Sequence, residues 1–213
     1  MNRAKDEILD RIRRAINDVS TSCTSDYAAI AREYQRSANL DQGSRMNLFA
    51  ERLHDYGAVV YRGSHVHLPE TIARALAVRS KRKLLIPKNV PQEWLPPTFE
   101  FVRDDGLSYE AIDQSEGVLT GCAVAVALTG TIVLRHSSGE GRRALTLIPD
   151  YHLCVVLADQ IVETVPEGIR RAAGFGRVPI TTLSGPSATS DIEMTRIKGV
   201  HGPRTLDVIL VVS

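Results

Sequence analysis

The sequence predicts an α/β fold, with a mixed, mostly parallel sheet flanked by helices and a helical arm at the N-terminus. Hydrophobic residues make up 43% of the 213 residues but aromatic residues only 5%, so the core must consist of Val, Ile, Leu and Ala, as in a parallel sheet covered on both faces. Helical and strand-like hydrophobic patterns alternate along most of the chain, which is typical of parallel pairing. Charged residues make up 24%, and this balance excludes a disordered or collagen-like chain.

Residues 1–43 predict the helical arm. Apolar side chains recur at helical spacing over residues 3–19, with Arg and Asp between them, and so indicate an amphipathic helix. A second short helix is expected over residues 27–34, before the polar run of residues 37–45 breaks the pattern. The arm holds seven basic and seven acidic residues, so we expect it to pack against the body of the protein or against a partner rather than to bind through charge.

Residues 44–213 predict the α/β domain, and strands and helices alternate in its first half. We expect helices over residues 47–56, 68–78 and 107–113, and strands over residues 58–61, 84–86 and 99–102. A strand that is followed by a helix and then by another strand pairs in parallel with it, so this half should supply the parallel part of the sheet.

The second half of the domain is richer in strands. We expect them over residues 131–134, 145–148, 153–157, 180–183 and 206–212, with a helix over residues 163–173. The first two of these strands flank the segment SSGEGRR and should form a hairpin, which makes the sheet mixed. Residues 117–134 are uncharged, but three glycines and three threonines interrupt them, so they predict a buried strand, helix and strand rather than a membrane span.

Composition and motifs exclude several functions. Twenty-six basic and 25 acidic residues give a net charge of +1, which provides no field to attract nucleic acid. The N-terminus alternates acids and bases without an apolar leader, so we expect a cytoplasmic protein. Cys23, Cys122 and Cys154 are far apart and form no CxxC motif, so we expect this chain to bind no zinc, iron–sulfur cluster or other cofactor. There is no GxGxxG, Walker A or GxSxG motif, and no third ligand can be assigned to His65 and His67 for a metal site.

Four loops, over residues 129–131, 137–143, 184–193 and 199–203, have the composition of a ligand site, which in open α/β sheets lies at the carboxyl ends of the strands. In the first two loops, glycines would let a ligand approach the backbone, while the arginines could pair with an anion. The alternative for these loops is a hairpin turn with solvated arginines. Their candidate binding residues are Thr129, Gly130, Thr131, Arg142 and Arg143.

The other two loops contain groups that could transfer a proton. Ser190 and Glu193 have the spacing of a capping box, so a helix should begin at Ser190, and its amides could bind a phosphate or carboxylate. Because Asp191 and Glu193 already supply negative charge there, the alternative is that these acids are themselves the working groups. His201 lies between two glycines and could act near neutral pH, although a histidine in a turn is usually structural.

The last hundred residues resemble the lactate-utilisation protein C family, whose domain is called LUD. The resemblance rests on LTGTIVL, GRRALTLIPDYHLCVV, LSGPSATSDIE and KGVHGPRTLDVILV in that order, and most of all on GPSATSDIE followed by GVHGP. It extends more weakly to NLFAERLHDYGAVVYR and so covers residues 44–213, and we expect it to include the helical arm as well. It implies a fold similar to the ribose-5-phosphate isomerase, glucosamine-6-phosphate isomerase and CoA-transferase group.

The resemblance also implies a function: a subunit without a cluster in a cytosolic system that oxidises L-lactate to pyruvate. The iron–sulfur clusters would belong to two companion proteins, and a small carboxylate would be the ligand of this chain. The alternatives are a stand-alone enzyme of the same fold that acts on a small anion, a sugar phosphate or a CoA ester, and a non-catalytic scaffold. No catalytic activity of this chain is evident from the sequence.

The resemblance selects the candidate site residues and shows two departures. The catalytic candidates are His201, Glu193 and Asp191; the binding candidates are Thr129, Gly130, Thr131, Arg142, Arg143, Gly185, Ser187, Thr189 and Gly202. Leu128 stands where the family usually has Glu, and Ala188 stands where it often has Arg. An acid and a cation are therefore missing, which implies either a different ligand or a purely structural role.

Overall fold

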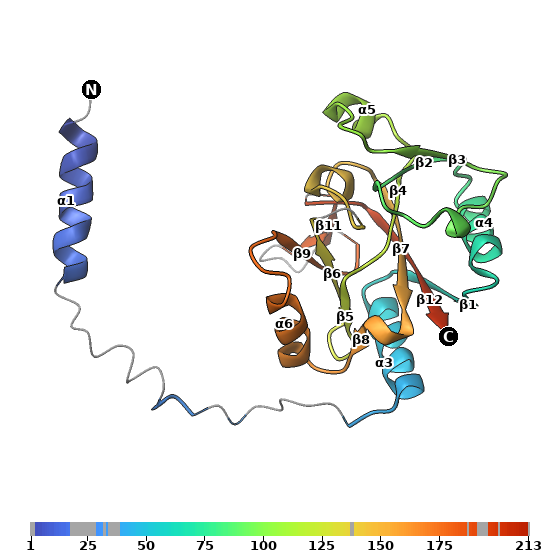
Figure 1. The fold of residues 1–213 in the computed structure, drawn as a ribbon, viewed down its shortest axis with the longest axis horizontal. Coiled ribbons are helices and arrows are strands. Elements are labelled where there is room, and N and C mark those ends of the chain that lie inside the picture. The colour runs from blue at the N-terminus through green and yellow to red at the C-terminus, as the bar shows by residue number, and fades with distance from the viewer. Residues whose placement is uncertain are drawn as a thin grey trace. The chain divides into compact units, whose positions relative to one another are not determined.

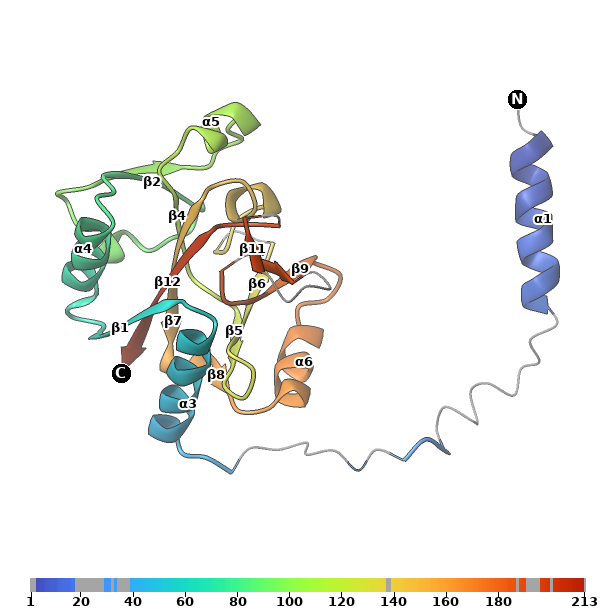
Figure 2. The same ribbon diagram turned by 180° about the vertical axis from the view of Figure 1, so that it is seen from behind.

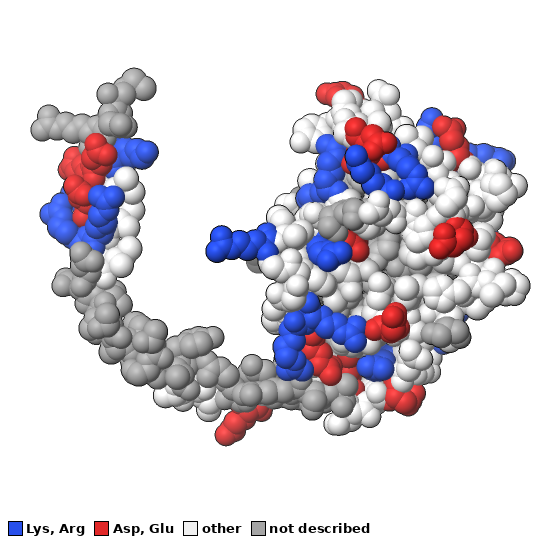
Figure 3. All heavy atoms as spheres, in the orientation of Figure 1, with Lys and Arg blue, Asp and Glu red and all other residues white. Residues whose placement is uncertain are grey.

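The computed structural model describes residues 3–17, 29–31, 33, 39–136, 139–186, 188–190, 196–199 and 201–212. The chain divides into two compact units, Met1–Gln35 and Arg36–Ser213. The first unit contains helix α1 (Arg3–Asn17), which confirms the predicted amphipathic helix, since its charged side chains lie on one side and uncharged ones on the other (Figure 3). The short helix predicted over residues 27–34 falls largely outside the described residues.

The second unit is built on a six-stranded sheet in the order β1-β12-β7-β4-β2-β3 (Figure 1). All five neighbouring pairs are parallel. The strands are β1 (Val59–Ser64), β12 (Thr205–Val212), β7 (Tyr151–Leu157), β4 (Val118–Thr120), β2 (Lys83–Ile86) and β3 (Glu100–Arg103). The predicted alternation of strands and helices is thus confirmed, and the central strands β7 and β12 are the long apolar runs expected of a sheet covered on both faces.

Two helices cover the opposite faces of this sheet. Successive side chains of a strand point to opposite faces, so Cys154 and Val156 of β7 join one core cluster and Val155 joins the other. Helix α3 (Gln42–Asp55) packs its apolar side into the first cluster, and helix α4 (Leu68–Val78) packs into the second. Figure 2 shows α3 and α4 on their separate sides.

A second, four-stranded sheet lies on the α3 side, in the order β8-β5-β6-β9. Its strands are β8 (Ile161–Val162), β5 (Val124–Val126), β6 (Thr131–Arg135) and β9 (Ile180–Ser184), and β6 is antiparallel to both β5 and β9. Helix α6 (Val165–Ala173) packs against β5 and β8. It begins at a capping box, because Thr164 accepts a hydrogen bond from the Glu167 amide while Glu167 accepts from the Thr164 amide. The mixed pairing expected of one sheet is therefore divided between two sheets.

Three local predictions are wrong. The segment predicted as a strand over residues 145–148, with its hairpin, instead contains the 3-10 helix η2 (Arg143–Thr146). The apolar run is buried without pairing in a sheet, because Leu145 packs in a cluster with Ile112 and Val118. The helix predicted within residues 117–134 is strand β5, whose β-branched residues pair with β6.

The third error concerns the helix predicted from Ser190. Residues Ala188–Ser190 form strand β10, which pairs antiparallel with β11 (Arg196–Lys198). The backbone amides of residues 191–193, which a capping box at Ser190 would leave free for an anion, lie outside the described residues, and the chain is again in a strand from Arg196.

The remaining elements are short: α5 (Tyr109–Asp113) and the 3-10 helices η1 (Gln92–Trp94) and η3 (Ala158–Gln160). Among the described residues, no helix is both long enough and apolar enough to cross a membrane. Acidic and basic side chains are interspersed over the visible face of the second unit (Figure 3).

Candidate functional site

A cavity of about 260 Å³ lies where the amino ends of β7 and β12 meet strand β9. Its wall includes Arg143, His152, Ser184, His201 and Gly202. The register aligns His152 at the start of β7 with Leu206 at the start of β12, and both line the cavity. The cavity therefore lies at the opposite end of these strands from the carboxyl ends at which the sequence places a ligand site.

A second cavity of about 550 Å³ lies next to the first, where β2 and β3 end. It is lined by Lys88, Asp104, His136 and Arg142, among others. Arg143 lines both cavities. A hydrogen bond also joins the walls of the two cavities: His136 Nε2, in the second, lies 2.7 Å from the hydroxyl of Thr181 on β9, in the first.

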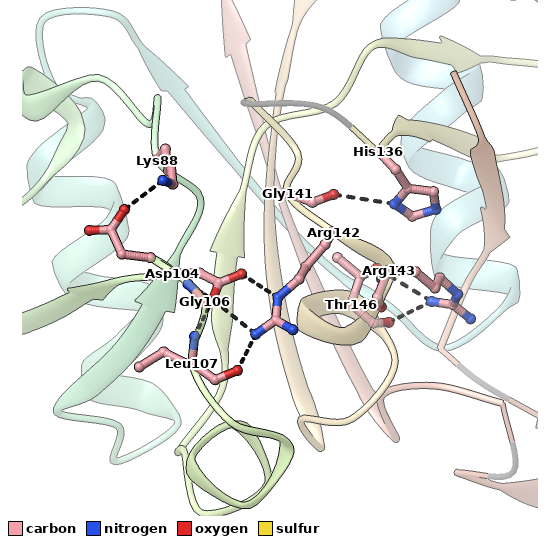
Figure 4. Close-up of polar contacts among 10 residues, drawn as sticks. Lys88, Asp104, Gly106, Leu107, His136, Gly141, Arg142, Arg143 and Thr146 are labelled. Carbon is pink, nitrogen blue, oxygen red and sulfur yellow. Dashed lines mark hydrogen bonds and ion pairs between the residues drawn. The ribbon is translucent and has the colours of Figure 1, made fainter. Parts of the chain in front are cut away.

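Arg142 is engaged in an internal ion pair. Its Nε and Nη2 atoms donate to the two carboxylate oxygens of Asp104 over 2.7 and 3.0 Å, and Nη2 also donates to the Leu107 carbonyl (Figure 4). Burial raises the pKa of Asp104, but Arg142 and the amides of Leu107 and Gly106 outweigh it and bring this pKa below its ordinary value. The Arg142 guanidinium thus already pairs bidentately with an internal carboxylate, whereas the sequence predicted that it would bind an anionic ligand.

Arg143 points away from Asp104 and is placed differently (Figure 4). Its Nη1 donates to the Thr146 carbonyl over 3.0 Å and its Nη2 to the His201 carbonyl over 3.1 Å. Burial lowers the pKa of this guanidinium, and within the described residues no carboxylate lies in ion-pair distance of it. Arg143 is therefore a partly desolvated cation at the cavity, anchored by neutral oxygens, with further N–H donors on its planar group.

His201 and Gly202 come from the loop before β12, as the motif GVHGP predicts. The His201 side chain is exposed, and its carbonyl fixes Arg143. Gly202 has φ of 151°, in a region that favours glycine. The structure thus brings Arg143, His201 and Gly202 together, as the sequence expects, although the link between Arg143 and His201 is made by the backbone.

The glycines of two other candidate loops serve helix packing. A Cβ atom on Gly130 would lie 2.8 Å from Arg52 Cβ, and one on Gly185 would lie 2.3 Å from Tyr56 Cβ. Arg52 lies on α3 and Tyr56 directly follows it, so both glycines let this helix approach the second sheet. Gly185 also lines the cavity.

Thr129 and Thr131 do not line this cavity but are connected to its wall through hydroxyl contacts. Their hydroxyls are 2.7 Å apart, and the Thr131 hydroxyl is 2.9 Å from the hydroxyl of Ser184, which lines the cavity. Ser187, Asp191 and Glu193 lie outside the described residues. Thr189 lies on β10, where only the backbone is described.

Sequence reasoning missed two residues of this region. Asp104 escaped notice because a lone acid after a short strand carries no signal of the arginine that it pairs with, 38 residues away. His152 lies within the apolar run of β7 and resembles a core residue, yet it lines the cavity and is fully buried. Burial, with the nearby charge of Arg143, lowers the pKa of His152 to about 4, so its ring is neutral at neutral pH.

Metal ligands do not gather in the described part of the chain: no group of three or more His, Cys, Asp or Glu side chains could hold a metal ion there. Cys122 and Cys154 are buried free thiols, and burial raises the pKa of both. The chemistry that the described site offers is therefore binding of an anion by Arg143 beside a neutral imidazole.

Comparisons with known proteins agree with this fold. Residues 104–211 match the model of the LUD domain. The chain is 44% identical over 211 residues to Lactate utilization protein C of Deinococcus radiodurans, covering 98% of this chain and 95% of that protein. It is 33% identical over 136 residues to Lactate utilization protein C of Bacillus subtilis, covering 61% of this chain and 56% of that one.

The same family is found among solved structures. The crystal structure of a DUF162 family protein from Deinococcus radiodurans superposes with a TM-score of 0.70 at 42% sequence identity, over 81% of this chain and 99% of that one. An identity of 44% over nearly the whole length, together with the match to the domain model over half of the chain, leaves one assignment: this chain belongs to the LUD domain family.

Proposed function

We propose that this protein takes part in lactate utilisation and that its cavity binds a small 2-hydroxy or 2-oxo carboxylate, such as L-lactate or pyruvate. Two relatives, one of them aligned with nearly the whole chain, carry the name Lactate utilization protein C. The cavity of about 260 Å³ suits a ligand of a few heavy atoms.

One observation carries the proposal: Arg143 is a cation at the cavity with no carboxylate in ion-pair distance among the described residues. Desolvating a guanidinium costs free energy, and the electrostatic attraction of a bound anion can offset that cost. A carboxylate matches the planar group with two parallel hydrogen bonds, and its single charge balances the single charge of Arg143.

We further propose that the chain is the component without a cluster in a system that oxidises L-lactate. L-Lactate loses two electrons and two protons when it becomes pyruvate, so an electron acceptor is required. In this proposal the acceptors are iron–sulfur clusters on two companion proteins, while this chain contributes a carboxylate-binding cavity in the cytoplasm. The resemblance of residues 44–213 to the lactate-utilisation family supports this division of tasks.

Calorimetric titration of the purified protein tests the binding proposal. L-Lactate, pyruvate and inorganic phosphate should be compared on the parent protein, on Arg143→Gln and on Arg62→Gln, whose guanidinium lies on β1 outside both cavities. Loss of charge-assisted hydrogen bonds should weaken carboxylate binding about 10- to 150-fold in Arg143→Gln and leave it unchanged in Arg62→Gln. Equal affinity of the parent and Arg143→Gln would overturn the proposal.

Isolation from the native host tests the proposal about partners. The tagged full-length protein should be purified from cells grown on lactate and analysed for iron and for co-purifying chains. Cysteine-rich, iron-containing partners in stoichiometric amount are expected. A protein that is isolated alone and without iron, and that turns over a substrate by itself, would favour the stand-alone enzyme instead.

A further inference from the structure

One nitrogen of the buried His152 ring stands out in the described part of the chain, because it makes no hydrogen bond there. The side chain is fully buried at the start of β7, and its Nδ1 has no hydrogen-bond partner in the described part of the chain. The other described atom of this kind is Nε of Arg45, which does not line the cavity. An unsatisfied buried nitrogen costs roughly 1–3 kcal/mol, and the cavity that His152 lines is where a bound ligand could supply the missing donor.

The surrounding hydrogen bonds determine which ring nitrogen carries the proton. The Thr120 hydroxyl is 2.8 Å from the Gly121 carbonyl and 2.8 Å from His152 Nε2. A carbonyl oxygen only accepts, so the arrangement that satisfies both contacts has the hydroxyl proton directed to Gly121 and the Nε2 proton directed to the Thr120 oxygen. Because the ring is neutral, Nδ1 then has a lone pair and no proton.

The ring therefore presents an acceptor beside a cation. His152 and Arg143 line the same cavity, and the charge of Arg143 acts on the His152 ring. A ligand that satisfies both groups needs an anion for the guanidinium and a hydroxyl or N–H donor next to it. A 2-hydroxy carboxylate has both on adjacent carbon atoms, whereas a 2-oxo carboxylate offers only acceptors.

We infer that His152 makes this cavity selective for a 2-hydroxy acid over the matching 2-oxo acid, with Nδ1 accepting a hydrogen bond from the 2-hydroxyl group while Arg143 binds the carboxylate. This inference rests on the proposed function. Thr120 is the positioning residue, because its hydroxyl fixes the proton on Nε2 and so keeps Nδ1 an acceptor. A keto oxygen opposite Nδ1 would place two lone pairs together, and the ring nitrogen would stay unsatisfied.

Two substitutions separate this role from simple packing. His152→Leu removes the acceptor, so the preference for L-lactate over pyruvate should fall from about tenfold or more to near unity. Thr120→Val keeps the volume but removes the acceptor for the Nε2 proton. The proton can then move to Nδ1, which becomes a donor, and the preference should shift toward pyruvate.

The test is the ratio of the L-lactate and pyruvate dissociation constants, measured by calorimetry on the full-length parent and on each variant. Thr71→Val is the matched control, since Thr71 is a buried threonine that lies outside the cavity and whose hydroxyl donates to the carbonyl of His67, the residue before its own helix. This control should keep the parent ratio. A purely structural role of Thr120 would weaken both ligands alike and leave the ratio unchanged, which would overturn the inference.

Nitrogen NMR of the histidine rings gives a second readout, which is measured on the parent protein and so does not depend on whether the variants fold. His152 should be in the Nε2–H form in the free protein, and L-lactate, but not pyruvate, should shift its Nδ1 resonance. A ring protonated at Nδ1, or equal shifts with both acids, would overturn the inference.

The two proposals fail in different ways. If Arg143→Gln abolishes binding of both acids while His152→Leu and Thr120→Val keep the parent ratio, the carboxylate site remains and the hydroxyl selectivity is wrong. If neither acid binds the parent protein, or Arg143→Gln binds both as well as the parent does, both proposals are wrong.

Discussion

Replacing Asp104 with Asn should destabilise the protein without weakening carboxylate binding, because Asp104 and Arg142 form a structural pair. The carboxylate accepts hydrogen bonds from Arg142 and from the amides of Gly106 and Leu107, the latter over 3.2 and 3.0 Å. The asparagine keeps an acceptor oxygen but removes the negative charge that these donors face.

The magnitude follows from how far each partner is buried. Removing one partner of a fully buried pair costs about 3–5 kcal/mol, whereas an exposed pair is worth about 0–1 kcal/mol. The Asp104 side chain is 7% exposed and that of Arg142 is 38% exposed, which places this pair between the two limits. We therefore expect a loss of about 2 kcal/mol in the free energy of unfolding, and a melting temperature about 4–8 °C lower.

The pH dependence has a definite sign. The folded-state pKa of Asp104 lies below its unfolded value, so its contribution is complete above the unfolded pKa of about 3.9 and disappears as the pH falls through the folded pKa. The parent and Asp104→Asn should therefore differ at pH 7 and converge at strongly acid pH.

Urea unfolding at several pH values measures this difference. Asp105→Asn is the matched control, because Asp105 is the neighbouring residue, is 71% exposed and pairs with Lys88 at the surface. It should change the free energy of unfolding by less than about 1 kcal/mol. The reasoning is refuted if Asp104→Asn behaves like Asp105→Asn, or if its destabilisation persists unchanged at acid pH.

Two further predictions concern packing and reactivity. Gly185→Ala should lower the free energy of unfolding by about 2–4 kcal/mol, because its Cβ would clash with Tyr56 and its φ is 81°. Gly57→Ala, at φ of 83° in open space, should lower it by only about 1 kcal/mol through backbone strain. Chemical denaturation of both variants measures the difference, and equal losses would contradict the close approach of Gly185 to Tyr56. Cys122 and Cys154 should resist alkylation in the native protein and react after unfolding, because both thiols are buried and burial raises their pKa, that of Cys154 to about 12. Mass spectrometry of the labelled protein detects the modification, and rapid labelling of either thiol in the native protein would contradict their burial.

Most of the elements could be predicted from the hydrophobic pattern, because their apolar periods match the surfaces that they bury. Helix α4 begins and ends at the predicted residues, and β7 and β12 are apolar runs that a two-sided core requires. The residues around Leu145 could not be assigned this way, since a short apolar run buries equally well from a strand or from a 3-10 turn. Local pattern likewise gives no sign that β10 has a partner in β11 and so does not begin a helix.

The site was predictable only in part, because the decisive contacts join distant segments. His201 and Gly202 of the GVHGP motif line a cavity, and glycines around a histidine are the sequence signal of an accessible turn there. The sequence could not show that Gly130 and Gly185 accommodate α3, because the helix that approaches them lies more than seventy residues earlier in the chain. Nor could it show that His152, in a strand, has one ring nitrogen without a hydrogen-bond partner among the described residues.

The adjacent arginines show why residue type alone does not define a ligand site. Arg142 directly precedes η2 and Arg143 begins it, so consecutive side chains leave the backbone in different directions (Figure 4). Arg142 meets Asp104 at the end of β3, and Lys88 meets Asp105, so both of these cations in the larger cavity are already neutralised by acids. Among the described residues, Arg143 adds one positive charge without such an acid. A monoanion balances that charge, whereas a phosphate dianion would leave one negative charge unpaired in a partly desolvated cavity. The charge balance thus favours a carboxylate over a sugar phosphate, independently of any resemblance to known proteins.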